Sequence, residues 1–471
     1  MRRWAWTCYR AQMSIKSTRR AFLAGAATLA AGCATSRATS TAARPPNIVY
    51  VFPDEHRYQS LSFTETPQVR TPNLARMAEE GTFFTHCISN YPVCSPHRAM
   101  LMSGRWPYQT GVIDNSIPLD PAGPTLGRTF QQSGYETGYI GKWHLGGNRA
   151  EPYGFDTSLI WTGTGQHFNR SEYHPASGPP VRAEGYNATV MMNQAVEFID
   201  RHQATPFFLM LALDPPHSDF TDAPEDKKAL YPPGSIPFRP NYVEHTDKGN
   251  VLQHNGSPYY EGYHAHITAV DEEMGRLLRA LQERNLTEDT IVVYSSDHGS
   301  MHGSHGAGSK RQPYEESIRV PFLLHGPGRV PAGLKVDALF GTPDILPTLC
   351  GLAGVTVPAV SVGRDYTPWL RGEHGPDPAH QFIMHIAKDN ASGGEKHPAP
   401  LFRGLRTKTH TYAVGVEGPM CLFDNVADPY QLNNLIGASE QAALRARLAG
   451  ELKLMLAQAG DSFPVDLPAQ T

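Results

Sequence analysis

Short apolar runs alternate along the chain with longer stretches of helical periodicity. Five runs rich in β-branched and aromatic residues have the length of buried strands, at 47–52, 136–141, 206–213, 290–296 and 320–326. Three stretches repeat apolar residues every three or four positions, as amphipathic helices do, at 71–81, 187–203 and 263–284. This alternation predicts an α/β fold with a large, mostly parallel central sheet flanked by helices.

The pattern changes beyond about residue 366. Shorter apolar runs follow there, and a long helical pattern closes the chain. We therefore expect a main domain over 46–365 and a smaller C-terminal α+β subdomain over 366–471, with an antiparallel sheet and a packed helix.

The N-terminus has the pattern of an export signal. Arg19 and Arg20 precede an apolar run of about a dozen residues, too short to span a bilayer, and small residues lead to Cys33. Residues 1–33 resemble a twin-arginine signal ending in a lipobox, with 34–45 as a tether and either Met1 or Met13 as the start. We expect a periplasmic or cell-surface lipoprotein anchored in the membrane through Cys33; the alternative is an ordinary signal peptide in which Cys33 is incidental.

Composition narrows the choice of partners. The chain of 471 residues has 40% hydrophobic residues and a formal net charge of −4. Residues 1–32 contain six Lys and Arg and no acid, so the exported chain would carry about −10. This charge disfavours nucleic acid as a partner. Four cysteines remain after the leader, Cys87, Cys94, Cys350 and Cys421, too few and too scattered for a disulfide framework.

Polar residues follow four of the predicted strands. They are Asp54-Glu55, Lys142-Trp143-His144, Asp214-Pro215-Pro216-His217 and Asp297-His298. Each could be an ordinary cap or loop residue. Because parallel strands end at the same edge of a sheet, four such ends together predict a functional site there.

Cys94 lies at a predicted helix start. Pro96 fits the first helical turn, with Ser95 as a candidate cap, so backbone N–H groups would favour negative charge at position 94. Arg98 lies one turn further on the same face. From the residues alone, Cys94 is either a reactive thiolate or a buried core residue.

The stretch C-S-P-H-R, followed by an apolar turn and S-G-R, resembles the signature of the type I sulfatases. Further motifs follow the order of that family, at 44–55, 134–146, 206–217 and 290–310. The resemblance implies an alkaline-phosphatase-like fold. It also implies that a formylglycine-generating enzyme or an anaerobic sulfatase-maturating enzyme converts Cys94 to 3-oxoalanine (formylglycine), whose hydrate is the nucleophile.

The same resemblance implies roles for the remaining residues. Arg98 would support the ionised hydrate, Lys142 and Lys310 would bind sulfate oxygens, His217 or Lys310 would be the general acid, and His144 the base. His305 is a candidate on the substrate side, or else a plain loop histidine. A hard divalent cation, Ca²⁺ or alternatively Mg²⁺, would be held by Asp54, Glu55, Cys94, Asp297 and His298. Glu55 departs from the family's more usual Asp or Gln, so Asp54 is the safer ligand.

The resulting hypothesis is an exported sulfatase that hydrolyses sulfate monoesters, with sulfated carbohydrate as the expected substrate class. One alternative keeps the nucleophile and changes the substrate to a phosphonate monoester or phosphodiester. The other is a catalytically inactive surface binding protein in which Cys94 is never modified.

Overall fold

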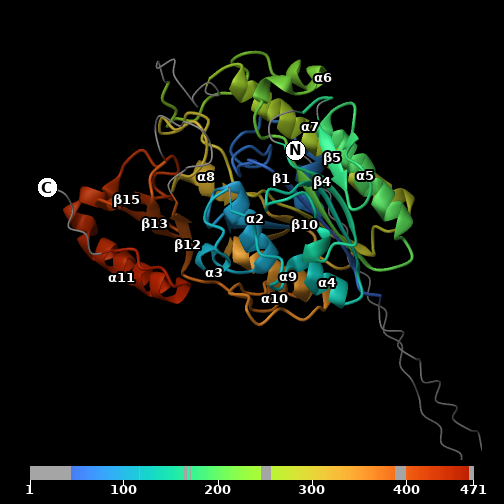
Figure 1. Cartoon of the computed structure of the whole chain (residues 1–471). Coiled ribbons are helices and arrows are strands. Elements are labelled where there is room, and N and C mark those ends of the chain that lie inside the picture. Colours follow the sequence, from blue (N-terminus) through green and yellow to red (C-terminus); the bar gives the residue numbers. More distant parts are fainter. Residues whose placement is uncertain are drawn as a thin grey trace, which may run out of the picture. The chain divides into compact units, whose positions relative to one another are not determined.

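A mixed sheet organises the main part of the protein (Figure 1). The computed structural model describes residues 44–115, 117–163, 167–169, 171–244, 256–387 and 399–465. Within these ranges the sheet has eleven strands, in the order β11 (Leu334–Gly341), β2 (Thr82–Ile88), β10 (Leu323–His325), β8 (Thr290–Tyr294), β1 (Asn47–Pro53), β7 (Phe207–Leu213), β3 (Glu136–Lys142), β4 (Thr157–Trp161), β5 (Glu172–Pro175) and β6 (Val181–Arg182), with β9 (Arg319–Val320) paired to β2.

The centre of this sheet is parallel, as predicted. Strands β8, β1, β7, β3 and β4 pair in parallel, whereas β10, β9, β5 and β6 pair antiparallel to their neighbours. Val51 is level with both Leu211 and Tyr294, so three neighbouring strands end at one edge. The strand expected at 320–326 is divided into β9 and β10, because Pro321 has no N–H to continue the ladder.

Helices cover both faces of the sheet. Val49 and Val51 pack with the helices α1 (Pro72–Glu80), α5 (Asn187–Arg201) and α7 (Tyr259–Glu283), which confirm the three predicted helices. Ile48, Tyr50 and Phe52 face the other layer, which contains α2 (Cys94–Ser103), α4 (Leu126–Gln132) and α9 (Thr342–Ala353). The short helices are α3 (Pro107–Thr110), α6 (Glu225–Lys228), α8 (Glu315–Ile318) and α10 (Thr367–Leu370), with 3₁₀ turns η1 (Glu151–Tyr153), η2 (Phe220–Asp222), η4 (Leu435–Gly437) and η5 (Ser439–Gln441).

The C-terminal part is an antiparallel sheet with a helix on it, as predicted. It contains β12 (His380–His385), β13 (Phe402–Thr407), β14 (His410–Gly415), β15 (Gly418–Asp424) and α11 (Ala442–Ala459). Leu448, Leu452 and Leu456 of α11 pack in one cluster with Tyr91 and Val93, which lead into α2. From Arg44 onward the chain forms one compact unit, and the boundary near residue 366 stays a prediction.

Some predictions lie outside the described residues. These are the leader at 1–33, with Cys33 and both candidate starts, and residues 34–43 of the tether. In the ranges that are described, no helix is long and apolar enough to cross a membrane.

Candidate functional site

Four adjacent strand ends bring the predicted site residues together. Strands β8, β1, β7 and β3 are neighbours, and the polar residues that follow them meet beyond their carboxyl ends. Ligand atoms of Asp54, Cys94, Asp297 and His298 all lie within 4.8 Å of one another, and all four residues are buried. A second such group contains Asp54, Glu55 and His217.

Cys94 is the first residue of α2. The N-cap is Val93, in extended backbone, and Cys94 is 1% exposed. Ser95, the candidate cap, lies inside the helix instead. Its hydroxyl donates to the backbone oxygens of Asn115 and His144, which lie 20 and 49 positions further along the chain. Ser95 therefore connects the helix start to the loop after β3. The prediction that Ser95 caps the helix is therefore wrong.

The thiol of Cys94 lies in a charged environment. Its Sγ is 3.3 Å from His298 Nε2, 3.3 Å from Lys310 Nζ and 3.7 Å from Asp54 Oδ1. Burial and the Asp54 carboxylate oppose ionisation, yet Lys310, His298 and Lys142 hold the pKa of this thiol well below its ordinary value.

The other cysteines of the fold behave differently. Burial raises the pKa of the thiols of Cys87, Cys350 and Cys421, to about 12 for the last two. Cys94 therefore differs in kind from a core cysteine, because cations surround it.

Arg98 neutralises the carboxylates rather than touching the thiol. Its Nη2 lies 3.0 Å from Asp54 Oδ2 and 3.1 Å from Asp297 Oδ2, and its Nη1 donates to the backbone oxygen of Lys142 at 2.7 Å. The guanidinium also lies 4.9 Å from the ring centroid of Phe52. One buried cation thus joins β1, β3 and β8 at the site.

The two central aspartates have opposite pKa shifts. Burial alone would raise the pKa of the Asp54 carboxyl, but Lys142 and Lys310 hold it well below its usual range. Burial, together with the charge of Asp54, raises the pKa of Asp297 to about 7. Two buried carboxylates that repel each other beside His298 offer the mainly oxygen donor set that suits a hard divalent cation. The residues therefore fit the predicted metal.

Glu55 lies beside Asp54, and its carboxylate pairs with Lys310 and His217. Its backbone is left-handed, with φ of 72°, and its carboxylate lies 2.5 Å from Lys310 Nζ and 3.8 Å from His217 Nε2. Burial opposes its ionisation, but Lys310 and His217 lower the pKa of Glu55. Glu55 thus holds the two groups that were predicted as general-acid candidates.

Lys142 is shared between two carboxylates. Its Nζ lies 2.7 Å from Asp54 Oδ2 and 3.0 Å from Asp214 Oδ1, and the residue is 1% exposed. Although burial disfavours the charge, Asp54 and Asp214 raise the pKa of Lys142. An ammonium group has three N–H donors, so one remains for a further acceptor.

The three predicted histidines other than His298 differ in their surroundings. His217 is partly exposed, and burial followed by the charge of Lys142 lowers its pKa. His144 has φ of 53°, and its Nδ1 has no hydrogen-bond partner among the described residues. His305 stacks on Tyr314 at 3.9 Å and lies 3.0 Å from Asn241 Nδ2. The roles predicted for these histidines stay predictions.

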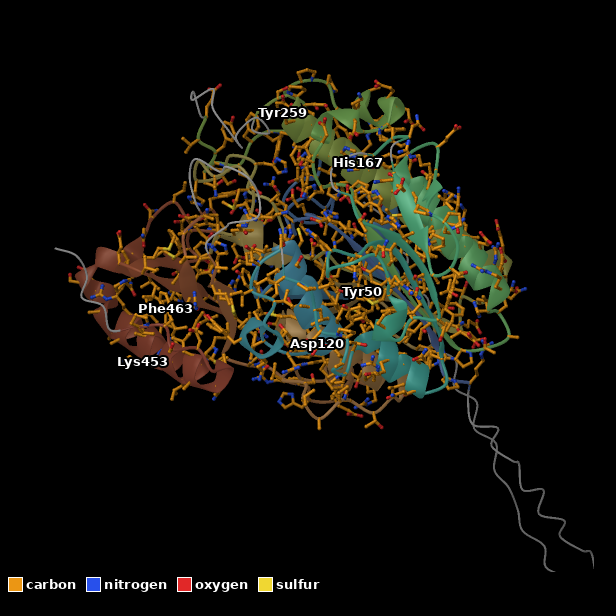
Figure 2. All side chains as sticks on the ribbon, viewed as in Figure 1. Tyr50, Asp120, His167, Tyr259, Lys453 and Phe463 are labelled. Atoms are coloured by element: carbon orange, nitrogen blue, oxygen red, sulfur yellow. The ribbon has the colours of Figure 1, made fainter. Side chains whose placement is uncertain are left out.

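The sequence indicated only a loop near the pocket rim for His167, without a role, and the structure shows that this residue, labelled in Figure 2, is fully buried. Its Nε2 lies 3.1 Å from Asp214 Oδ2, and its Nδ1 lies 2.5 Å from Asp222 Oδ1. Asp214 could have been found, because it directly follows a predicted strand. The contacts of His167 had no local signal, since its partners lie 47 and 55 positions away in the sequence.

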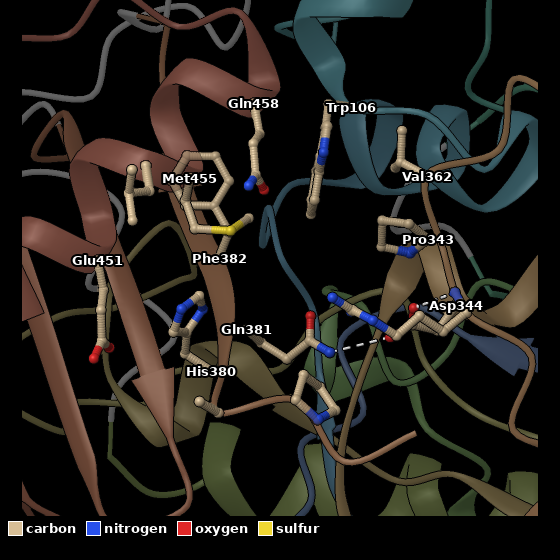
Figure 3. Close-up of a pocket in the computed structure, with 14 residues that line it drawn as sticks. Trp106, Pro343, Asp344, Val362, His380, Gln381, Phe382, Glu451, Met455 and Gln458 are labelled. Carbon is tan, nitrogen blue, oxygen red and sulfur yellow. Dashed lines mark hydrogen bonds between the residues drawn. The ribbon is translucent and has the colours of Figure 1, made fainter. Parts of the chain in front are cut away.

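A separate pocket of about 510 Å³ lies between the C-terminal sheet and α11 on one side and Trp106 and the start of α9 on the other (Figure 3). Trp106, Phe382 and Met455 line it with His380 and Glu451. It contains none of the predicted site residues. Charge and geometry, rather than concavity, therefore single out the strand-end cluster.

Comparison with known proteins decides the family. The family model described as "Sulfatase" matches residues 46–355. The chain belongs to the sulfatase family. A second family model, "N-sulphoglucosamine sulphohydrolase, C-terminal", matches residues 303–458 of this sulfatase. The enzyme is a sulfuric ester hydrolase with the alkaline-phosphatase-like fold that the sequence predicted.

Individual relatives agree with this assignment. The sulfatase is 36% identical to the ulvan-active sulfatase of Formosa agariphila, over 89% of this chain and 82% of that one. It is 28% identical to the endo-4-O-sulfatase of Bacteroides thetaiotaomicron, over 92% of this chain and 96% of the relative. A solved Bacteroides thetaiotaomicron structure, from work on its metabolism of glycosaminoglycans, has a TM-score of 0.80 at 28% identity and covers 89% of this chain and 97% of its own.

Proposed function

We propose that this sulfatase hydrolyses sulfate monoesters on carbohydrates, with a formylglycine hydrate made from Cys94 as the nucleophile. The environment of Cys94 carries the proposal, because His298 and Lys310 lie 3.3 Å from its sulfur and Asp54 lies 3.7 Å from it. Cations at these distances stabilise an anionic oxygen at this position.

We infer the conversion of Cys94 to formylglycine because a thiol nucleophile has no easy way to release the sulfate group it accepts. A sulfated cysteine could not readily release its sulfate, whereas a sulfated aldehyde hydrate collapses to the aldehyde and expels it. Conversion of the side chain from CH₂SH to CHO removes sulfur and two hydrogens and adds one oxygen. We assign this oxidation to a formylglycine-generating or anaerobic sulfatase-maturating enzyme, which supplies the oxidant.

Two lysines would bind the sulfate group. Lys142 and Lys310 both lie beside Asp54, at 2.7 Å and 3.9 Å, and their charges surround the space next to Cys94. Positive charge on the sulfuryl oxygens stabilises the charge that develops as the ester bond breaks. In this proposal Arg98 offsets Asp54 and Asp297, so that the site remains close to electrically balanced.

Proton transfer would fall to the histidines. His217 is partly exposed, and its Nε2 lies 3.8 Å from Glu55 Oε1, so its imidazole lies where it can exchange a proton with a bound group or with solvent. We assign it the donation of a proton to the leaving oxygen, with Lys310 as the alternative donor. His144 would accept the proton when sulfate is expelled.

A divalent cation would be held by Asp54, Asp297, His298 and the oxygen at position 94, with Glu55 at the edge of the site. When bound, it lowers the pKa of a coordinated hydroxyl and polarises a sulfate oxygen. Oxygen-rich ligands favour Ca²⁺, with Mg²⁺ as the alternative. Dialysis against EDTA should abolish activity, and Ca²⁺ should restore it.

The names of the relatives support a glycan substrate, since one acts on ulvan and another is an endo-4-O-sulfatase. We also propose export by the twin-arginine route and a lipid anchor at Cys33, on the pattern of residues 1–33. Replacing Arg19 and Arg20 by Lys should leave the enzyme in the cytoplasm when cell fractions are assayed.

Substrate pairs and a nucleophile variant test the function. The wild-type enzyme should cleave 4-nitrophenyl sulfate and sulfated oligosaccharides far faster than a phenyl phosphonate ester, and Cys94→Ala should lose all turnover. Faster cleavage of the phosphonate ester would make it a phosphonate monoester hydrolase. Full activity in Cys94→Ala would refute the nucleophile, and a wild-type enzyme that binds sulfated glycans without cleaving them would be a binding protein.

A further inference from the structure

His167 contacts both ends of the loop that carries His217. Its Nε2 lies at ion-pair distance, 3.1 Å, from Asp214 Oδ2. Its Nδ1 donates to Asp222 Oδ1 at 2.5 Å, and its backbone N–H donates to Asp222 Oδ2 at 3.0 Å. Asp214 precedes His217 by three residues and Asp222 follows it by five. One buried side chain therefore connects the start and the end of this loop.

The charges in this contact chain alternate in sign. Lys142 pairs with Asp214, Asp214 with His167, and His167 with Asp222. Burial alone would lower the pKa of His167, but the two carboxylates raise it to about 9. Burial would raise the pKa of Asp214, but Lys142, together with a cationic His167, keeps this carboxylate ionised in a place where an isolated charge would be costly.

Asp214 in turn determines where the ammonium of Lys142 lies. With Asp214 on one side and Asp54 on the other, Nζ is held at 3.0 Å and 2.7 Å from two oxygens. Without Asp214, the ammonium would be drawn to Asp54 alone, and the remaining N–H would no longer point in a defined direction.

Two further contacts, made by His266 and by Asn187, also hold His167 and the loop that carries His217. The His266 ring lies 4.5 Å from that of His167, and its Nε2 bonds the backbone oxygen of Asp219 in the same loop at 3.1 Å. The backbone oxygen of His167 accepts from the N–H of Asn187, the first residue of α5. His167 is thus attached to a helix that does not belong to the active-site edge.

We propose that His167 is a positioning residue that holds Lys142, through Asp214, and His217, through both ends of its loop. The inference rests on the proposed roles of Lys142 at the sulfate and His217 at the leaving group. It adds a residue that touches neither substrate nor metal but fixes two groups that do.

Single and double variants test the route through Asp214. With 4-nitrophenyl sulfate, His167→Gln and Asp214→Asn should each lower kcat/KM by about 10²-fold, as loss of one charge-stabilising donor does. The double variant should be no worse than Asp214→Asn, because His167 acts on Lys142 only through that carboxylate. Multiplied losses in the double variant would overturn the proposal.

The leaving group tests the route through His217. A nitrophenolate leaves without a proton, whereas a sugar alkoxide needs one. His167→Gln should therefore lose more kcat on a sulfated sugar than on 4-nitrophenyl sulfate, and Asp222→Asn should show the same bias. Equal losses on both substrates would contradict the clamp on His217.

A matched control separates positioning from stability. His202 lies after α5, near Glu136 at the opposite end of β3, and His202→Gln should leave kcat/KM unchanged. Any His167→Gln enzyme that has the wild-type melting temperature and wild-type kcat/KM would refute the inference. If His167→Gln behaves as expected but Cys94→Ala stays active, the proposed nucleophile fails and the positioning role stands.

Discussion

Arg98 is the residue on which the charge balance of the site depends. Its guanidinium lies 3.0 Å and 3.1 Å from two carboxylates, and the residue is 1% exposed. The two aspartates it contacts are also two of the proposed metal ligands. Arg98 therefore contributes to both stability and activity, because its ion pairs compensate the buried charge of Asp54 and Asp297 and also position these two proposed metal ligands.

Removing Arg98 should harm stability and activity together. Arg98→Ala leaves Asp54 and Asp297 with one fewer cation, and we expect a loss of about 3–5 kcal/mol in the free energy of unfolding. Urea denaturation without added metal measures it. Arg105, whose guanidinium contacts the exposed backbone of Gln109, is the matched control, and Arg105→Ala should change stability little. Equal stabilities of the two variants would argue against this account.

Candidate site residues could be predicted from the sequence where a short local pattern marked them. Cys94, Arg98 and the strand-end residues Asp54, Lys142 and Asp297 were found from strand patterns and the spacing of one helix. Pairings across the sequence could not be found. Lys142 meets Asp214 from 72 positions away, and Asp271 meets Leu74 from 197. Ser95 looked like a cap, but its hydroxyl bonds to the backbone oxygen of His144.

At the scale of the elements, β3 approaches β7 closely just before Lys142. Gly141 has φ of 109°, and a Cβ built there would lie 2.1 Å from the backbone oxygen of Ala212. Only glycine allows both this conformation and this approach. The position of Lys142 thus depends on a missing side chain one residue earlier.

Alanine substitutions at two glycines with positive φ distinguish the cost of backbone strain from the cost of a steric clash. Gly134 has φ of 83°, and a Cβ added there would meet no atom within 4 Å, so Gly134→Ala should cost about 1–2 kcal/mol through backbone strain alone. Gly141→Ala adds the collision and should cost about 3 kcal/mol or more, with loss of activity. Denaturation midpoints and kcat/KM measure the difference. Equal costs would show that β3 and β7 can separate without consequence.

The start of α1 depends on a carboxylate from α7. Asp271 accepts hydrogen bonds from the backbone N–H groups of Asn73 and Leu74 at 3.1 Å and 2.8 Å, whereas the side chain of Thr71, the N-cap residue of α1, makes no capping hydrogen bond. Burial raises the pKa of Asp271 to about 6 despite these bonds. The folded protein then binds more protons than the unfolded chain between about pH 4 and pH 6, so this group lowers stability as pH rises through that window.

Asp271→Asn should remove that contribution. Between pH 4 and pH 6, the free energy of unfolding of the wild type should fall relative to that of the variant. The difference should reach up to about 3 kcal/mol, because one pKa unit corresponds to about 1.4 kcal/mol. Urea titrations of both proteins across this range give the comparison. Parallel curves would mean that Asp271 titrates as it does in the unfolded chain.

At the scale of the whole molecule, the C-terminal sheet shares its core with the main sheet. Ile88, Ile318 and Leu339 pack in one cluster with Ile383 and Phe402 of the C-terminal strands. Beside that cluster, Arg406 of β13 forms two contacts with Glu315 of α8, at 2.8 Å and 2.9 Å. The two parts should therefore unfold in one transition.

Breaking the Arg406–Glu315 pair tests this coupling. Arg406→Met leaves a buried carboxylate and should cost about 3–5 kcal/mol, whereas Arg406→Met combined with Glu315→Leu should recover most of the loss. Both variants should keep a single unfolding transition by calorimetry. Two separated transitions would contradict the shared core.

The central claim is that Cys94 is a precursor, and the mass of the peptide containing residue 94 tests it most directly. In enzyme purified from its own host, the account predicts a peptide in which one oxygen replaces sulfur and two hydrogens, and which reacts with a hydrazide. An intact cysteine at position 94 in enzyme that cleaves sulfate esters would contradict it.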